Sequence, residues 1–189
     1  MSASSIEGRT LLRREEIAST VERLGAAIAA DHPEGVVVVG LLKGGVCLVA
    51  DLVRNIPVDC SVDFLALMPY GAGRSRVALA KDLDIDVAGR GVVIAVDIVD
   101  SGLTVSYVRR LLSERGARSA DVCTLLDRRP SRLLPVDLRY VGLAIGTEYV
   151  IGYGLDFEER YRNLPLLLAT DPETLRRAES ANVDSRGER

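Results

Sequence analysis

Apolar β-branched runs alternate with amphipathic stretches along this sequence, and this alternation limits the folds open to the chain. Residues 35–41 contain four consecutive valines with no polar residue between them. Such a run is typical of a strand covered on both faces. Residues 13–31 instead place apolar side chains at helical spacing. Because the alternation is repeated, we expect an α/β fold with a central, mostly parallel sheet.

The expected elements fit one compact domain, because 189 residues are too few for two ordinary cores. We expect strands at residues 35–41, 61–68, 92–96, 120–126, 140–145 and 149–153, and helices at 13–31, 46–55 and 104–115. From about residue 170 the chain becomes polar and rich in Ser, Arg and Glu. We therefore expect a domain at residues 1–169 and a flexible tail at 170–189.

Composition excludes several classes of function. The net charge of -3 leaves no basic surplus for a nucleic-acid backbone, which favours small-molecule chemistry. We find no signal peptide and no membrane span. The three cysteines form no CxxC pair, as expected for reduced thiols in the cytoplasm. The only histidine, His32, precedes a proline and is expected on a surface turn, which argues against histidine-centred catalysis.

The segment after the strand 35–41 consists of Leu42, Lys43, Gly44 and Gly45. In open α/β sheets, ligands bind beyond the carboxyl ends of the strands. Two glycines let backbone amides approach an anion, and Lys43 adds positive charge. A plain turn has the same pattern, so the signal is weak alone. Only Lys43 and Lys81 are lysines among the 24 basic residues, which makes a lysine here more notable.

A stronger signal follows the apolar run 92–96. Asp97, Asp100, Ser101, Gly102 and Thr104 combine carboxylates, a turn and the start of a helix. Backbone amides and the helix dipole there favour a phosphate, and the carboxylates suit ribose hydroxyls or proton transfer. Helix capping explains Asp100 or Ser101 alone, but it does not explain Asp97 at the end of a buried strand. We therefore favour a binding site over simple capping.

Half of the eight aromatic residues lie close together near the C-terminus: Tyr149, Tyr153, Phe157 and Tyr161. Flat side chains can stack on a heterocyclic base. Their spacing of four is also compatible with helix packing, although two glycines within the segment argue against a continuous helix. From the residues alone, stacking and core packing stay open.

These motifs resemble those of the hypoxanthine-guanine phosphoribosyltransferases of bacterial type. Residues 92–104 look like the motif that binds phosphoribosyl pyrophosphate (PRPP), and residues 150–157 with 161–165 are similar to the purine branch. The similarity spans about residues 11–168. It implies the type I phosphoribosyltransferase fold, in which helices flank the sheet and a small hood covers one end. The implied activity transfers phosphoribosyl from PRPP to a 6-oxopurine, releasing pyrophosphate.

The resemblance also implies roles for particular residues, with Asp100 as the catalytic acid or base. The ribose phosphate would contact Asp97, Asp100, Ser101, Gly102, Leu103 and Thr104. Pyrophosphate would contact Leu42, Lys43, Gly44, Gly45 and Arg162, and the peptide between the first two can be cis in the family. The base would contact Arg128, Arg129, Tyr149, Val150 and Asp156. Mg²⁺ would lie near Asp97 and Asp156, and a lid would begin at Pro69, Tyr70 and Gly71. The implied partners are PRPP, a purine-type base and further copies of the chain, as a homodimer or homotetramer.

The sequence departs from the family pattern around this same site. Val96 replaces a glutamate, so we expect weaker binding of PRPP or Mg²⁺. Arg128 and Arg129 stand where the family has a purine-reading lysine, which is not a conservative change. Pro69 and residues 145–147 also differ. Two alternatives follow: a paralogue acting on a modified purine such as a 7-deazaguanine, or a regulator that binds PRPP or nucleotide without turnover.

Overall fold

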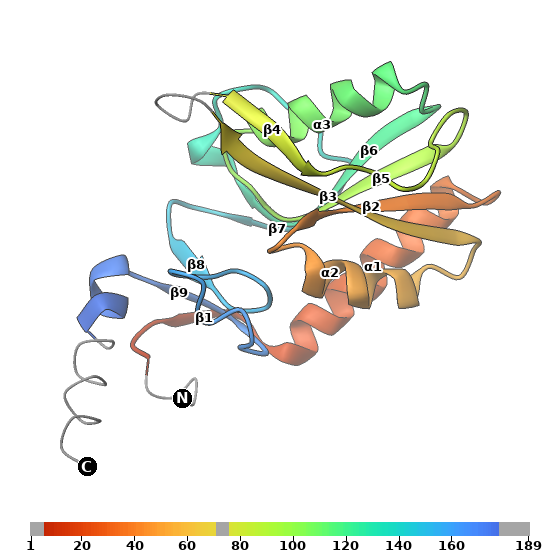
Figure 1. Ribbon diagram of the computed structural model, residues 1–189. Helices are drawn as coiled ribbons and strands as arrows, with labels where there is room; N and C mark the ends of the chain where they lie inside the picture. Colours follow the sequence, from red (N-terminus) through yellow and green to blue (C-terminus); the bar gives the residue numbers. More distant parts are fainter. Residues whose placement is uncertain (1–5, 71–75, 178–189) are drawn as a thin grey trace, which may run out of the picture.

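Two β-sheets of different size form the framework of the molecule (Figure 1). The computed structural model describes residues 6–70 and 76–177. The larger sheet has six strands in the order β4-β3-β2-β5-β6-β7, and all are parallel except β4, which pairs antiparallel with β3. Its strands are β2 (Val36–Leu42), β3 (Cys60–Tyr70), β4 (Arg76–Lys81), β5 (Gly91–Val99), β6 (Ser119–Arg128) and β7 (Tyr140–Ile145). The predicted fold class is confirmed.

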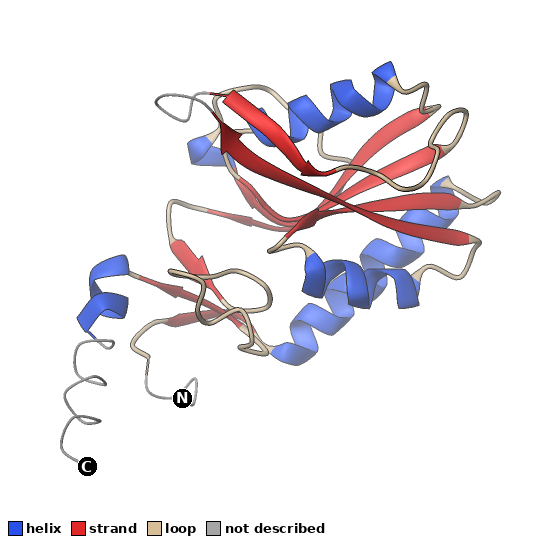
Figure 2. Ribbon diagram, in the orientation of Figure 1, coloured by secondary structure: helices blue, strands red, loops and turns tan. Residues whose placement is uncertain are grey.

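Helices cover both faces of the large sheet (Figure 2). α1 (Arg14–Asp31) and α2 (Val46–Leu52) lie on one face, and α3 (Leu103–Glu114) lies on the other. In β2, Val36 and Val38 pack toward α1 and α2, whereas Val37 and Val39 pack toward α3. Both faces need apolar side chains, which is why this strand shows no alternation. Within the described ranges, every helix is too short or too polar to cross a membrane.

The small sheet and the loop 152–166 form a unit that we call the hood. Its strands are β1 (Arg9–Leu12), β8 (Tyr149–Ile151) and β9 (Leu167–Thr170), paired antiparallel in the order β1-β9-β8. A third apolar core fills the hood and includes Ile151, Phe157, Tyr161 and Leu175. Leu175 is fully buried and belongs to a helical segment at 172–177. The first part of the polar tail is therefore folded, and flexibility beyond residue 177 stays a prediction.

Most predicted elements are found with small shifts at their ends, but three strands were not predicted. β1, β4 and β9 are short, and each one pairs with a strand distant in the sequence or across a loop. Pairing of that kind leaves little local signal. The predicted helix 46–55 ends as the 3₁₀ turn Val53–Asn55.

The prediction of a surface position for His32 is wrong. His32 is 6% exposed and caps the C-terminal end of α1. A Cβ atom on Gly91 would lie 2.8 Å from His32 Nδ1, so the ring packs against the start of β5. Its Nε2 lies 3.6 Å from Asp121 Oδ2. The turn before Pro33 is therefore folded between the amino-terminal ends of two strands, far along the sheet from the carboxyl ends.

Candidate active site

A cavity of about 320 Å³ lies at the carboxyl ends of β2 and β5, and we call it the cleft. These strands are neighbours and parallel, so the segments that follow them meet at one edge of the sheet. Both of the predicted anion-binding segments line the cleft. The lining residues are Leu41, Leu42, Gly44, Val96, Asp97, Ile98, Val99, Asp100, Ser101, Gly102, Thr104 and Val105.

The segment 100–104 turns sharply into α3 and leaves amide groups free to bind an anion. Gly102 is the N-cap, with φ of 82°, a conformation that favours glycine. Ser101 Oγ accepts a hydrogen bond from the N–H of Leu103 at 3.3 Å. The carbonyl of Ser101 accepts from the N–H groups of Leu133 and Leu134, each at 3.0 Å, which braces the loop from behind. The remaining first-turn amides and the helix dipole favour a phosphate.

Asp97 lies directly against Gly44 of the other segment. A Cβ atom on Gly44 would lie 1.8 Å from Asp97 Oδ2, so only glycine leaves room for this carboxylate. The peptide bond between Leu42 and Lys43 is cis. Burial raises the pKa of Asp97 to about 6, against the lowering effect of its own N–H, the N–H of Ile98 and Arg162. Asp97 therefore changes charge closer to neutral pH than an ordinary aspartate.

Asp100, the predicted acid or base, is held by Arg128. Arg128 Nη1 donates to Asp100 Oδ1 at 2.8 Å, and Nη2 donates to the carbonyl of Glu148 at 2.7 Å. The Arg128 side chain is 15% exposed and that of Asp100 is 46% exposed. Arg128 thus contacts both the predicted acid or base and the residue before Tyr149.

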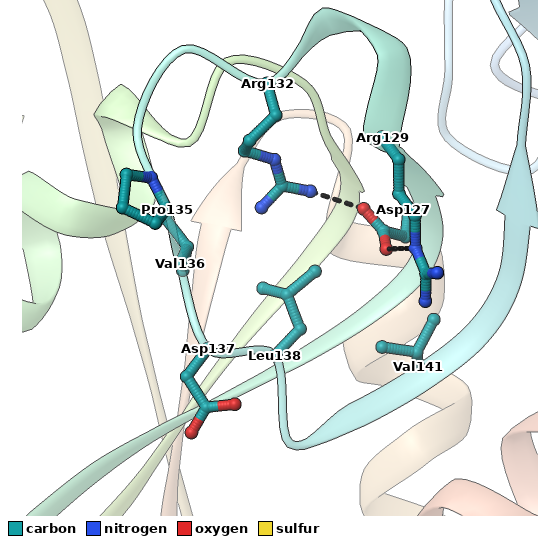
Figure 3. Close-up of a pocket in the computed structure, with 8 residues that line it drawn as sticks. All are labelled: Asp127, Arg129, Arg132, Pro135, Val136, Asp137, Leu138 and Val141. Carbon is teal, nitrogen blue, oxygen red and sulfur yellow. Dashed lines mark hydrogen bonds and ion pairs between the residues drawn. The ribbon is translucent and has the colours of Figure 1, made fainter.

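Arg129 points away from the cleft, although the resemblance placed it beside the base. Its Nε donates to Asp127 Oδ2 at 2.9 Å, and Arg132 donates to the other oxygen of the same carboxylate (Figure 3). These residues line a separate cavity of about 500 Å³. Asp127 is 5% exposed, so two guanidinium groups neutralise a buried charge. Of the two predicted base-contacting arginines, only Arg128 lies with Asp100.

The aromatic residues near the C-terminus divide between packing and the site. Phe157 and Tyr161 are buried in the hood core, and the Tyr153 hydroxyl donates to Asp51 at 2.6 Å. Tyr149 is half-buried, donates its hydroxyl to the carbonyl of Asp156 at 2.9 Å and contacts Phe157 edge to face. Tyr149 and Val150 belong to β8, an edge strand, which leaves some backbone groups available for a ligand.

The hood places the positive charge of Arg162 where it acts on Asp97, and it adds an acidic residue that the sequence analysis missed. Arg162 Nη1 donates to the carbonyl of Gly154 at 2.7 Å. Its Nη2 lies 2.9 Å from Asp156 Oδ1 and 3.2 Å from Glu159 Oε2. The same oxygen of Glu159 accepts from Lys43 Nζ at 3.0 Å. Both predicted pyrophosphate-binding cations therefore share one carboxylate. The long separation between Lys43 and Glu159 in the sequence gave no signal for this contact.

The acidic residues fit a magnesium ion that takes part of its coordination from substrate. In the described ranges, no three His, Cys, Asp or Glu residues cluster as a protein-only metal site. Mg²⁺ commonly binds one or two carboxylates together with substrate phosphates and water, and Asp97 and Asp156 could supply these. Val96 is 3% exposed and supplies no ligand. Both Asp156 oxygens already have partners, Arg162 and the N–H of Glu159, so the role of Asp97 and Asp156 as magnesium ligands stays a prediction.

The predicted lid is described only at its base. Pro69 and Tyr70 end β3, and Gly71 lies outside the described residues. The lid therefore stays a prediction.

Comparison with known proteins agrees with this geometry. Residues 9–158 match the family model described as the phosphoribosyl transferase domain. The chain is 42% identical to the hypoxanthine-guanine phosphoribosyltransferase of Mycobacterium avium over 86% of this chain and 85% of that protein. It is 40% identical to the hypoxanthine phosphoribosyltransferase of Escherichia coli K12, over 83% and 92%. The structure resembles the Staphylococcus aureus hypoxanthine phosphoribosyltransferase with a TM-score of 0.84 and 34% identity, over 90% and 94%. The chain belongs to the hypoxanthine-guanine branch of the phosphoribosyltransferase family.

Proposed function

We propose that this protein transfers the phosphoribosyl group of PRPP to a 6-oxopurine such as hypoxanthine or guanine, giving the nucleotide and pyrophosphate. One observation supports this most directly. The cleft combines an anion-binding helix start, the glycine segment 42–45 and two carboxylates, Asp97 and Asp100, at the ends of adjacent parallel strands. This set suits a sugar that has a phosphate at one end and a diphosphate at the other.

The two loops would bind opposite ends of PRPP. The 5-phosphate would accept hydrogen bonds from the amides of residues 101–104 at the start of α3. Asp97 would face the ribose hydroxyls, and Lys43 with Arg162 would bind the diphosphate. The base would stack on Tyr149, with the backbone of Val150 at its edge and Arg128 donating to the 6-carbonyl oxygen.

In the reaction, the bond between the anomeric carbon and the diphosphate oxygen breaks, and a bond to a purine nitrogen forms. Positive charge develops on the ribose, while negative charge builds on the departing diphosphate. Lys43 and Arg162 stabilise the departing charge, and Asp97 stabilises the ribose. As the unprotonated imidazole nitrogen of the purine forms this bond, the proton on the other nitrogen of the same ring passes to Asp100, so the product is a neutral base. When bound with PRPP, Mg²⁺ would supply further charge neutralisation at the diphosphate, near Asp97 and Asp156.

Replacing Asp100 tests this function. Asp100→Asn keeps the size of the side chain but removes a proton acceptor, so kcat should fall by about 10²–10⁴-fold. Asp137→Asn is the matched control, because Asp137 is an exposed aspartate on the separate cavity near Arg132. Pyrophosphate release from PRPP and hypoxanthine is the measurement. A nearly normal rate for Asp100→Asn would remove Asp100 from the mechanism.

A second candidate function is transfer to a modified purine, such as a 7-deazaguanine. It is favoured by Arg128, whose planar fork contacts Asp100 and the Glu148 carbonyl where the family has a lysine. Rates with hypoxanthine, guanine, xanthine, adenine and a deazaguanine would separate the two. PRPP binding without turnover on any of these bases would favour a regulator.

The location and assembly of the protein also belong to this proposal. We infer a cytoplasmic enzyme that self-associates as a homodimer or homotetramer. Sedimentation of the purified chain would test the assembly.

A further inference from the structure

Glu159 is the acidic residue shared by the two cations that the proposed function assigns to pyrophosphate. Its Oε2 lies 3.0 Å from Lys43 Nζ and 3.2 Å from Arg162 Nη2. One carboxylate oxygen between an ammonium and a guanidinium has the same arrangement that a phosphate oxygen would adopt between them. Glu159 therefore occupies the position where we expect the leaving group's charge.

We propose that Glu159 competes with diphosphate for Lys43 and Arg162, and so limits the affinity of the site for its leaving group. This inference rests on the proposed function. The Glu159 carboxylate would move outward when diphosphate binds. It would pair with Lys43 and Arg162 again when diphosphate leaves.

The side chain of Glu159 is placed to move. Lys43 and Glu159 are 68% and 64% exposed, and solvent-exposed ion pairs of this kind are weak. Its main chain is anchored, because the N–H of Glu159 donates to Asp156 Oδ2 at 2.9 Å. Rotation of the side chain alone would therefore break both ion pairs without displacing the loop.

Arg162, in contrast, is fixed independently of Glu159. Its Nη1 donates to the carbonyl of Gly154, and its Nη2 also contacts Asp156. The side chain is 26% exposed. Loss of the Glu159 contact thus leaves this guanidinium in place to receive a diphosphate oxygen.

Charge gives the direction of the effect. Diphosphate entering beside Asp97 and Asp156 also meets Glu159, and like charges at short range oppose binding. Removing the charge of Glu159 would relieve this repulsion and free two cationic donors. If Glu159 only positioned the two cations, removing its charge would weaken binding instead, so the sign of the change separates the two roles.

The test compares Glu159→Gln with Glu158→Gln. Glu158 is the next residue in the chain and is also exposed, so both variants lose one negative charge at nearly the same place. Calorimetric titration with sodium pyrophosphate, with and without Mg²⁺, gives the dissociation constants. We expect pyrophosphate to bind Glu159→Gln about threefold to tenfold more tightly than the unchanged chain, and Glu158→Gln nearly as the unchanged chain does. Inhibition of nucleotide formation by pyrophosphate should strengthen by the same factor.

The binding constants of the variants decide the role of Glu159. Equal or weaker binding to Glu159→Gln overturns the proposal, as does an equal gain in Glu158→Gln, which would indicate general charge alone. Glu159→Asp keeps the charge on a shorter side chain. Its affinity for pyrophosphate should lie between those of the unchanged chain and of Glu159→Gln. Failure of the unchanged chain to form nucleotide from PRPP would contradict the proposed function, whereas normal activity with unaltered pyrophosphate binding in Glu159→Gln would contradict only the role of Glu159.

Discussion

The only two lysines of this chain lie in opposite surroundings. Lys81 Nζ has four oxygen partners within 3.1 Å: Asp63 Oδ1 and Asp84 Oδ2, and the carbonyls of Phe64 and Asp82. Lys43 Nζ contacts one carboxylate, that of Glu159, and its side chain is 68% exposed against 37% for Lys81. The protein itself saturates the donors of Lys81, whereas Lys43 keeps donors for other acceptors.

The acidic partners differ in the same way. Asp63 is 5% exposed and accepts hydrogen bonds from the N–H groups of Phe64, Asp84 and Ile85 as well as from Lys81. Glu159 is 64% exposed and is bound by side chains alone. A buried carboxylate satisfied by backbone contributes to the fold, whereas an exposed one bound by cations can be exchanged for a ligand. We therefore expect changes near Lys81 to alter stability and changes near Lys43 to alter binding.

The largest expected effect on stability comes from Asp63→Ala. This change leaves the backbone N–H groups of Phe64, Asp84 and Ile85 without their acceptor and Lys81 without a buried partner. The free energy of unfolding should fall by about 3–5 kcal/mol. Urea denaturation followed by circular dichroism measures it. Glu159→Ala is the control and should unfold at nearly the same urea concentration as the unchanged chain. If Asp63→Ala and Glu159→Ala lost similar amounts of unfolding free energy, the contrast between the surroundings of Lys81 and Lys43 would be wrong.

The contribution of Asp97 to the free energy of unfolding should change with pH in the opposite direction to that of Asp63. Burial raises the pKa of Asp97 from 3.8 to about 6, so the native protein binds this proton more tightly than the unfolded chain does. Its contribution to stability is therefore lost as pH rises from about 4 to about 6. Asp97→Asn avoids this loss and should raise the unfolding free energy at pH 7.5 by about 2–3 kcal/mol, with little change near pH 4.

Asp63 provides the contrast for that measurement. Burial alone would raise the pKa of Asp63, but the N–H groups of Ile85 and Phe64, with Lys81, hold it below its ordinary value. Its contribution is present at neutral pH and is lost as pH falls through the native pKa. Urea unfolding of Asp97→Asn and Asp63→Asn from pH 4 to 7.5, in EDTA, should give changes of opposite sign at neutral pH. A destabilised Asp97→Asn at pH 7.5 would show that Asp97 supports the fold.

Matched substitution of the lysines should separate their roles with a smaller effect. Lys81→Met should lower the Tm by about 4 °C or more, because four acceptors lose their donor, and should leave pyrophosphate affinity unchanged. Lys43→Met should shift the Tm by less than about 1 °C and weaken pyrophosphate binding by roughly tenfold. Differential scanning calorimetry and titration with pyrophosphate measure both. If Lys43→Met instead lowered the Tm and Lys81→Met weakened pyrophosphate binding, the roles assigned to the two lysines would be reversed.

The sequence predicted the large sheet well because its strands are buried on both faces. The apolar runs in β2 and β5 need no tertiary information, and the polar residues after them lie at one sheet edge as a consequence of parallel order. That is why the cleft, with Asp97 and Asp100, could be located. β1 and β9 instead depend on each other across the whole chain, so their short sequences gave no signal.

The partners of charged residues could not be predicted in the same way. Arg128 and Arg129 are neighbours in sequence, yet one pairs with Asp100 and the other with Asp127. Which of the two reaches the cleft is decided by the turn that starts at Arg129 at the end of β6. Glu159 escaped notice because it belongs to a loop with positive φ at Glu158, Glu159 and Tyr161, where no periodic pattern exists. His32 was misplaced because the burial of a turn depends on the strands around it.

Arg128 is a third cation, more buried than either lysine, and replacing it should give the smallest effect. Its two Nη groups join Asp100 to the Glu148 carbonyl, and a lysine ammonium is too compact to bridge both in the same planar geometry. Arg128→Lys should therefore lower the Tm by no more than about 2 °C and change the KM for hypoxanthine by about twofold to fivefold. The KM for PRPP should change less than the KM for hypoxanthine, because Arg128 contacts only Asp100 of the segment 100–104. Steady-state kinetics with each substrate varied in turn measures both. A changed KM for PRPP with an unchanged KM for the base would place Arg128 with Lys43 as a residue for the leaving group, and a large loss of Tm would place it with Lys81 as part of the fold.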